Sequence, residues 1–403
     1  MFKLALRNLF RQKVRTLITL TTIMFGVAAV IIAGGFVEDV YAQLRDATIK
    51  SRYGYIQLYK AGYYEHGQRE PYTYMVEAPQ KLITEFERLP GVHDVFQRLN
   101  FSAMLNNTKT DRSVIVEGIE PAPEAEFATF LSIIAGRHLT ADDAYGIVIG
   151  EGVAVALDLA PGDYVNVIAN TTYGSMNSLE FEVVGVFQSF SREFDARAVR
   201  IPLDTAKELL DTTAVHALVF ALEDVSHVEP IMQWLERYIL GSAYEAKSWL
   251  ELDDFYPKTV QMYQSQFGVL QLIILVIVLM SVANSVSMTA NERIGEFGTL
   301  RAIGRTSTDV FRLLLTENTV LGLLGATAGV ALGIGVALAI SAVGLPMPPP
   351  PNANVGYTAY IRIVPLACVS AFFIGLIATV VSALLTCRKP TRIPIADALR
   401  QNI

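Results

Sequence analysis

The residues most able to do chemistry gather in one stretch of the C-terminal half, NERIGEFGTLRAIGRT (Asn291–Thr306). It holds three arginines and two glutamates, whereas the flanking chain is predominantly apolar. On a helix, Ile294, Phe297, Leu300 and Ile303 would share one apolar face and the charged residues would occupy the others. This arrangement suits docking to a partner through apolar and charged contacts. The stretch therefore predicts a short amphipathic helix that docks on a soluble protein, or alternatively a plain interfacial loop helix.

Motifs for bond-making chemistry are missing from the sequence. It contains no G-x-x-x-x-G-K-[ST] phosphate-binding loop, no H-E-x-x-H and no G-x-S-x-G. The five histidines lie at spacings that suggest no metal site. The sequence therefore predicts a chain that is not an enzyme, that binds no cofactor or metal itself, and that has no nucleic-acid partner.

Four stretches without charged residues are long enough to cross a bilayer, which takes about 20 apolar residues. They are Thr16–Val37, Thr259–Asn291, Asn318–Ile361 (which ends in a proline-rich loop) and Ile363–Cys387. The first could be a cleaved signal peptide, but its apolar part exceeds the usual length of about 7–15 residues, so we expect it to remain as a span. Ion and proton pathways normally place ionisable residues within the spans, so a channel or secondary transporter is not expected.

Charge predicts how the chain is oriented. Between Val37 and Gln266 there are 18 Lys and Arg against 34 Asp and Glu, whereas the rest of the chain has 14 against 5. Short loops rich in Lys and Arg stay on the cytoplasmic side. We therefore expect both termini and the charged stretch inside, and the acidic domain between the first two spans outside.

The region between the first two spans mixes β-rich runs, such as YVNVIAN and LEFEVVGVF, with helical spacing in APQKLITEFERLPGV and LDTAKELLD. This predicts a large extracytoplasmic α+β domain with more than one lobe. The predicted order is a cytoplasmic amphipathic helix (1–16), a first transmembrane helix (17–37), the α+β domain (38–266), a second transmembrane helix (267–289), a cytoplasmic helix and loop (290–311), a third transmembrane helix (312–344), a proline-rich loop (345–362), a fourth transmembrane helix (363–387) and a cytoplasmic tail (388–403).

Two further patterns predict contacts. Seven of the 17 tyrosines lie between Arg52 and Tyr74, and aromatic rings with a polar tip suit a surface for a partner or lipid. The candidate surface residues are Tyr53, Tyr55, Tyr59, Tyr63 and Tyr64, although ordinary strands packed on a core would explain them as well. Small residues four apart let helices approach closely, so the third span is expected to pack through Gly325, Gly329 and Gly333.

The charged stretch and its continuation resemble the signature region of the FtsX/MacB-type ABC transporter permeases, roughly E-R-x-x-E-I-G-x-L-R-A-x-G followed by an acidic residue and a Gly-rich span. The matching residues are Glu292, Arg293, Glu296, Gly298, Leu300, Arg301, Ala302, Gly304 and the later Glu317. Phe297 replaces the usual Ile. VIVEGIEP, LSIIAGRHLT and GIVIGEGVAVALDLAPGDYVNV are similar to the family's periplasmic core domain, called MacB-like, and RKPTRIPIADALR resembles its closing basic segment. Length and order of elements are closest to the lipoprotein-releasing LolC/LolE type.

The resemblance implies an ABC permease that works with a separate ATPase chain, on which ATP and Mg are bound. The coupling helix would meet that ATPase through Glu292, Arg293, Glu296, Leu300, Arg301 and Gly304. Nucleotide-driven movement would then reach the periplasmic domain, a process called mechanotransmission.

The implied partners are the ATPase, a second permease subunit in a homo- or heterodimer, membrane lipids, and a periplasmic carrier or adaptor. The implied location is the bacterial inner membrane, and the implied substrate is a lipoprotein or lipid-like molecule taken from the outer leaflet. An FtsX-like mechanical signaller and a MacB-like efflux component are the alternatives. The hairpin ANTTYGSMNSLE is shorter than the carrier-binding hook of LolC and lacks proline, so PMPPPPNANVGYTAY (Pro346–Tyr360) is a second candidate contact.

Overall fold

The computed structural model describes residues 13–67, 69–349, 356–388 and 393–394. The chain divides into a helical unit (Met1–Tyr41, Val260–Pro346 and Thr358–Ile403) and an α+β domain (Ala42–Thr259 and Met347–Tyr357). Most of the predicted N-terminal helix and of the predicted cytoplasmic tail, including the closing basic segment, lies outside the described residues.

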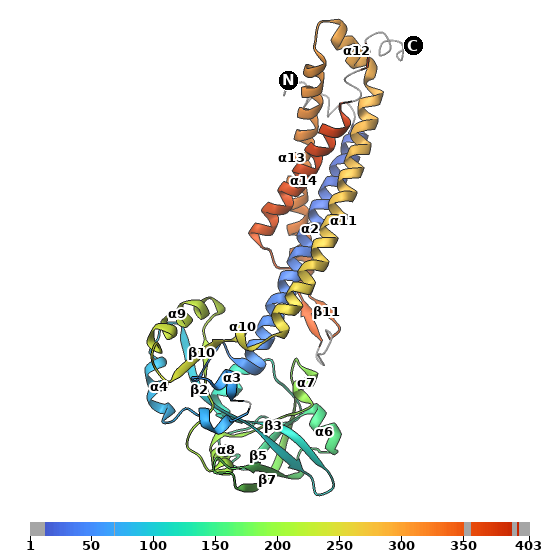
Figure 1. Cartoon of the computed structure of the whole chain (residues 1–403). Coiled ribbons are helices and arrows are strands. Elements are labelled where there is room, and N and C mark those ends of the chain that lie inside the picture. The colour runs from blue at the N-terminus through green and yellow to red at the C-terminus, as the bar shows by residue number, and fades with distance from the viewer. Residues whose placement is uncertain (1–12, 68, 350–355, 389–392, 395–403) are drawn as a thin grey trace. The chain divides into compact units, whose positions relative to one another are not determined.

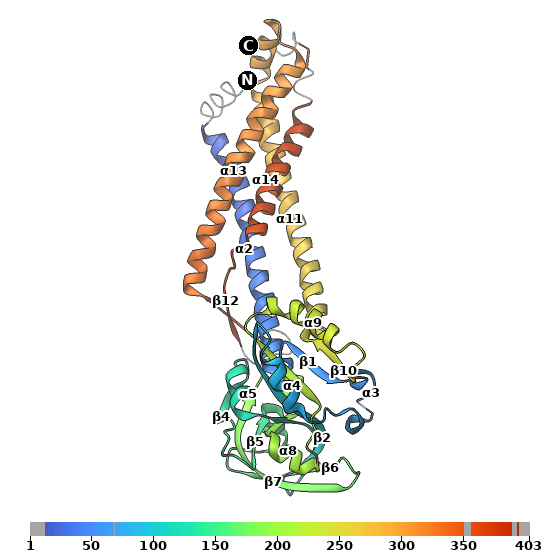
Figure 2. The same ribbon diagram turned by 90° about the vertical axis from the view of Figure 1, so that its left-hand side faces the viewer.

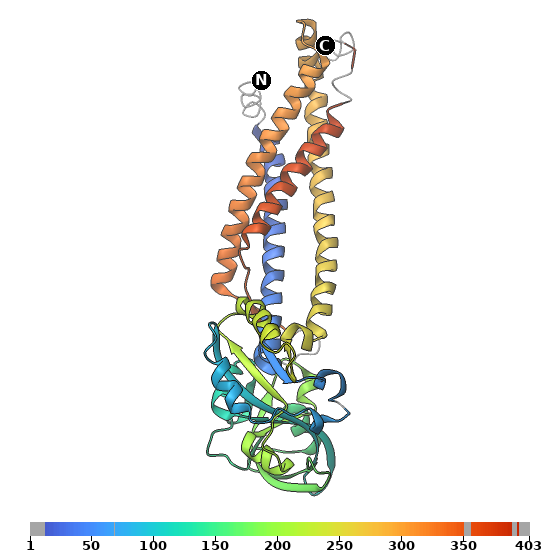
Figure 3. The ribbon, with the colours of Figure 1, turned by 60° about the vertical axis from the view of Figure 1, so that its left-hand side comes forward.

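Four helices of the described chain are long and apolar enough to cross a membrane. They are α2 (Lys13–Thr48), α11 (Phe255–Glu292), α13 (Ser307–Val343) and α14 (Pro365–Thr386). Figures 1 and 3 show that they run beside one another. The four predicted transmembrane helices are thus confirmed as helices. The bounds of α2 and α11 lie beyond the predicted spans, because an apolar count finds only the part of a helix that is suited to lipid.

Hydroxyl groups join these helices across their shared interior. Thr19 of α2 and Ser285 of α11 are hydrogen-bonded through their side chains, and Ser382 of α14 donates to the carbonyl of Leu279 at 3.0 Å. Lipid is as apolar as the side chains it would replace, so packing and hydrogen bonds of this kind hold spans together. Small and hydroxylated residues therefore suit the faces at which these helices meet.

The α+β domain is built on ten strands that belong to one branched sheet. The strands are β1 (Ile56–Lys60), β2 (Val92–Asn106), β3 (Asp111–Ile119), β4 (Ser132–Gly136), β5 (Gly146–Gly150), β6 (Tyr164–Asn170), β7 (Met176–Gln188), β8 (Ala198–Pro202), β9 (Ala217–Leu222) and β10 (Tyr244–Ser248). Short helices connect them: α3 (Tyr63–His66), α4 (Pro79–Phe86), α5 (Pro121–Phe127), α6 (Glu151–Leu157), α7 (Arg192–Asp195), α8 (Leu203–Leu210), α9 (Val228–Tyr238) and α10 (Trp249–Leu252). A separate two-stranded sheet pairs β11 (Leu345–Met347) with β12 (Tyr357–Ala359).

One lobe is a four-stranded antiparallel sheet in the order β10-β1-β9-β2. Helix α4 lies between β1 and β2 in the chain, and α9 lies between β9 and β10. This is the split β-α-β arrangement found in ferredoxin-like folds. Both helices pack on the sheet through aromatic residues, because the Phe86 ring lies 5.4 Å from that of Phe220 and 6.2 Å from that of Trp234.

The second lobe is a ring of six strands, made of β2 and five strands that lie between β2 and β9 in the chain. Strand β2 pairs with β3, β3 with β8, β8 with β5, β5 with β7, β7 with β6, and β6 again with β2. The ring is therefore a closed barrel, and closure leaves no free edge among its members. Helix α8 lies against β2, β3, β6, β7 and β8 (Figure 2). It buries Ala206, Leu209 and Leu210 there.

The long strand β2 belongs to both lobes. Its first half, from Val92 to Arg98, pairs with β9, and its second half, from Arg98 to Asn106, pairs with β3. The two lobes share one continuous apolar core that includes Leu58, Leu99 and Phe181. The predicted α+β domain with more than one lobe is confirmed.

Candidate coupling site

The charged stretch forms a short helix between two long ones. Helix α11 ends at Glu292, and Arg293 has φ −99° and ψ 10°, which interrupts the helical path before α12 (Ile294–Ala302). Gly304 ends the turn with φ +102°, a backbone conformation that side chains disfavour. Thr306 then caps α13, because its hydroxyl accepts from the Asp309 amide at 3.2 Å while the Asp309 carboxylate accepts from the Thr306 amide at 3.1 Å.

The inner side of α12 is fixed to α13. Ile294 and Phe297 are buried, and Phe297 belongs to a cluster that contains Val310 and Leu314 of α13. Apolar packing of this kind sets how the short helix lies on the long one. It also explains why Ile294 and Phe297 are apolar.

An ion pair adds a specific link to that packing. The Arg293 guanidinium donates from Nη1 to Glu317 of α13 at 2.7 Å and from Nε to Glu296 of α12 at 2.9 Å. Arg293 and Glu317 are only 7% and 5% exposed. Among the predicted coupling residues, Arg293 therefore connects α12 to α13, and its role in coupling stays a prediction.

The remaining predicted coupling residues, in and beside α12, differ in their exposure to solvent. Glu292, Glu296 and Gly304 are exposed, whereas Leu300 is half-buried. Arg301 is half-buried as well and donates to the carbonyl of Ile393.

The structure also exposes a residue at this site that was not among the predicted coupling residues. Ile303 was expected on the apolar face, but it is 78% exposed. The helix ends at Ala302, so the i, i+3 spacing no longer applies one residue later. An apolar side chain beside the terminating Gly304 was the signal available in the sequence.

The predicted glycine face of α13 lies against α2. A Cβ atom at Gly329 would be 2.7 Å from Cβ of Val27, and one at Gly325 would be 2.9 Å from Cβ of Ile23. At Gly333 the nearest atoms, in Ala28 and Ile31, would be 3.2 Å away. All three positions therefore allow the two helices to approach more closely than side chains would permit.

The five tyrosines of the candidate surface do not share one environment. Tyr55 and Tyr59 are buried, Tyr53 and Tyr63 are half-buried, and Tyr64 is 49% exposed. The rings of Tyr59 and Tyr63 stack at 4.8 Å, and burial raises the pKa of Tyr63 to about 12. Packing on the domain core therefore accounts for Tyr55 and Tyr59, and a role of the five tyrosines in partner contact stays a prediction.

Comparison with known proteins shows to which family the chain belongs. The sequence model of the MacB-like periplasmic core domain matches residues 16–238, which is more than half of the chain, and that of the FtsX-like permease C-terminal region matches residues 268–395. The chain belongs to the FtsX/MacB/LolC family of ABC transporter permeases. The permease is therefore a multi-pass membrane protein.

Individual relatives are distant. The permease is 22% identical over 209 residues to an uncharacterized ABC transporter permease of Methanocaldococcus jannaschii, covering 49% of each chain. It is 22% identical over 194 residues to the lipoprotein-releasing system transmembrane protein LolC of Xylella fastidiosa, covering 47% of each. It is 26% identical over 352 residues to the pyoverdine export ATP-binding/permease protein PvdT of Pseudomonas syringae, covering 81% of the permease and 50% of the relative. The permease thus spans about half the length of the curated relatives it matches.

Proposed function

We propose that this chain is the membrane subunit of an ABC transporter in a bacterial inner membrane, with both termini in the cytoplasm. ATP would be hydrolysed by a separate chain that docks on the exposed side of α12. The movement would pass through the helices to the α+β domain, which would extract a lipoprotein or lipid-like substrate from the outer leaflet. The complex would contain a second permease subunit, and a periplasmic carrier would accept the substrate.

The observation that carries this proposal is the construction of α12. Its inner side is fixed to α13 by Phe297 and by the 2.7 Å contact between Arg293 and Glu317. Its outer side exposes the Glu296 carboxylate, and Glu292 and Ile303 are exposed just before and just after the helix. A helix that is exposed on one side and locked to a long helix on the other can receive force from a docked protein.

Two observations support the proposed substrate class. The apolar runs of the four spans contain no Asp, Glu, Lys, Arg or His, which argues against a polar pathway through the membrane. A LolC protein is among the relatives. Efflux of a small molecule is the second candidate, because the alignment to the pyoverdine exporter covers a larger share of the chain than that to LolC.

The test is purification of the full chain in mild detergent from its native host, followed by identification of every protein and lipid that accompanies it. We expect an ABC ATPase together with a lipoprotein or another acylated molecule. An ATPase with a small, non-acylated ligand would replace extraction by efflux. An ATPase with a hydrolase or sensor and no cargo would favour mechanical signalling, and absence of any ATPase would contradict the proposal altogether.

A further inference from the structure

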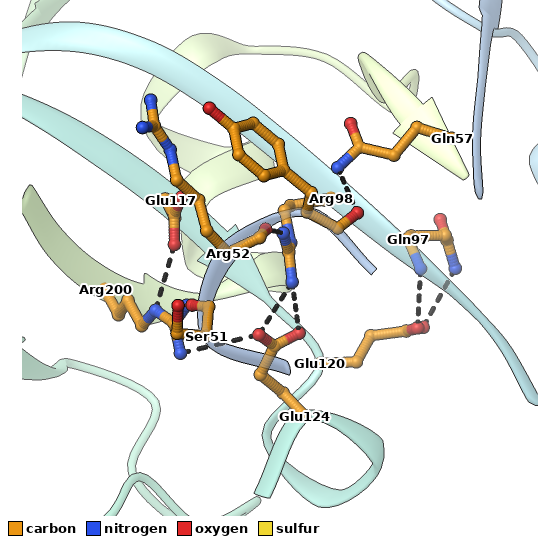
Figure 4. Close-up of polar contacts among 10 residues, drawn as sticks. Ser51, Arg52, Gln57, Gln97, Arg98, Glu117, Glu120, Glu124 and Arg200 are labelled. Carbon is orange, nitrogen blue, oxygen red and sulfur yellow. Dashed lines mark hydrogen bonds and ion pairs between the residues drawn. The ribbon is translucent and has the colours of Figure 1, made fainter. Parts of the chain in front are cut away.

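The end of α2 is held by side chains of the barrel. After Thr48 the helix continues as a π-helical turn, Ile49–Tyr53. The last carbonyls of a helix have no partner within it. Here the Ser51 carbonyl accepts from Nη2 of Arg200 at 3.1 Å, and the Arg52 carbonyl accepts from Nη1 of Arg98 (Figure 4).

The two arginines belong to the barrel, Arg98 to β2 and Arg200 to β8, and are 1% and 3% exposed. Two buried carboxylates balance them. Arg98 is bound to Glu124 of α5 at 2.7 Å, and Arg200 to Glu117 of β3 at 2.9 Å, with a further 3.4 Å contact to Glu124. Burial disfavours the charged form of Arg98, but Glu124 and Glu117 outweigh it and raise its pKa. The neighbouring Arg98 and Arg200 in turn outweigh burial and lower the pKa of Glu124, so Arg98 and Glu124 stay charged while buried.

Stability alone does not explain this cluster. Moving charges out of water costs as much as their pairing returns, and well-packed apolar residues often stabilise a core equally well. The charged cluster does provide specific contacts, because each arginine donates a hydrogen bond to a carbonyl of the Ile49–Tyr53 turn. That turn connects α2, which contains the first span, to the barrel.

Arg98 has a spare donor. Both Glu124 oxygens accept from the same nitrogen, Nη2, at 2.7 and 2.9 Å. The buried Nε has no hydrogen-bond partner among the described residues. A guanidinium normally meets a carboxylate through two parallel N–H···O bonds. If the turn moved away, Arg98 could make that two-bond contact with Glu124 through Nε and Nη2, so two of its three nitrogens would still be bonded, as they are now.

We propose that Arg98, assisted by Arg200, is a positioning residue that latches the end of α2 to the barrel and releases it during the ATPase cycle. Movement of the first span would thereby be converted into a change of the barrel. The inference rests on the proposed function, because it needs an ATPase that moves the helices.

The test uses the complex purified from the native host and measures amide hydrogen exchange with and without ATP. In the unaltered complex we expect exchange at residues 49–54 to accelerate about 10-fold on ATP binding. Unchanged exchange there, while exchange elsewhere in the α+β domain responds to ATP, would overturn the latch and leave the proposed function standing. No response to ATP anywhere in the chain would count against both.

A pair of variants separates the latch from simple stability. Arg98→Met combined with Glu124→Leu removes the latch but replaces it with apolar packing. We expect its Tm to stay close to that of the unaltered complex and its ATPase rate to stay within about twofold. The ATP-dependent change in amide exchange of β2, β3 and β8 should be lost. Arg137→Met is a control in the same domain, because Arg137 binds Asp143 at 2.7 Å and the carbonyl of His138, neither of which belongs to α2. A double variant that keeps the ATP-dependent change would overturn the proposal.

Discussion

The contact between α13 and α2 can be tested with one substitution at two places in the same helix. Gly329→Ala would place a Cβ atom 2.7 Å from Cβ of Val27 and 2.8 Å from the backbone oxygen of Met24. Gly335→Ala would add the same atom where nothing lies within 4 Å. Helix propensity changes equally at both positions and favours Ala by up to about 1 kcal/mol. The difference between the two variants therefore isolates packing.

The size of that difference follows from the distances. Carbon atoms pack best at about 3.5–4.0 Å, so the helices must separate by about 1 Å to accept the new methyl group at Gly329. A backbone oxygen cannot rotate away as a side chain can. Overpacking of this kind costs about 1–3 kcal/mol, and we expect Gly329→Ala to be less stable than Gly335→Ala by that amount.

The assay is unfolding of the full chain in detergent with increasing SDS, followed by far-UV circular dichroism. Gly325→Ala gives an intermediate case, because its nearest atoms belong only to the Ile23 side chain. The expected order of stability is Gly335→Ala, then Gly325→Ala, then Gly329→Ala. Equal stability of the Gly329 and Gly335 variants would refute the close approach of α13 to α2.

Two other substitutions test buried polar groups. Arg293→Met should lower the free energy of unfolding by about 3–5 kcal/mol, because it leaves the Glu317 carboxylate buried without that partner. Adding Glu317→Leu should restore most of the loss. Equal stability of the single and double variants in thermal unfolding would contradict the ion pair between Arg293 and Glu317. His216 is buried against Tyr63, and burial lowers its pKa to about 4. Below about pH 6.5 the unfolded chain binds a proton that the folded chain refuses, so stability falls as pH decreases. From about pH 7.5 to 5 this amounts to about 2 kcal/mol, or about 4–8 °C in Tm. His216→Phe should lose that share of the acid sensitivity, and an unchanged pH dependence of Tm would show that His216 is not its source.

The sequence was most informative where one physical property dominates. Runs without charge predicted the four long helices, because lipid tolerates little else. Several strands were also predictable: YVNVIAN coincides with β6, and LEFEVVGVF lies within β7. Their alternating or continuous apolar patterns reflect burial on one face or both.

The buried charge cluster could not be predicted in the same way. Arg98, Glu117, Glu124 and Arg200 are spread over about a hundred residues, and charged side chains are normally found on the surface. Only the closed ring of strands brings them together. A weak signal existed in AVRIP, where Arg200 sits inside a strand that is buried throughout, since a charge in such a place needs a partner.

The closed barrel could not be predicted from the sequence either. Its closure depends on β6 pairing with β2, whose paired residues Met104 and Ile168 are far apart in the chain. No local pattern specifies such a pairing. By contrast, the charges of the α12 segment were enough to locate it in the sequence. The prediction that Ile303 lies on the apolar face was wrong because it extended the helical period past Ala302, where the helix ends.

The central claim is that a separate ATPase docks on the exposed side of α12, and Ile303 tests it most directly. Ile303→Asp places a charge on a side chain that is 78% exposed, so the fold of the chain should not change. Ile134→Asp is the control, because Ile134 is 48% exposed in β4 of the α+β domain. The measurement is the amount of ATPase that co-purifies with each variant. We predict a loss of about 10-fold or more for Ile303→Asp, which corresponds to about 1.4 kcal/mol of binding free energy, and no loss for Ile134→Asp. Equal recovery of the ATPase with both variants would contradict docking at α12.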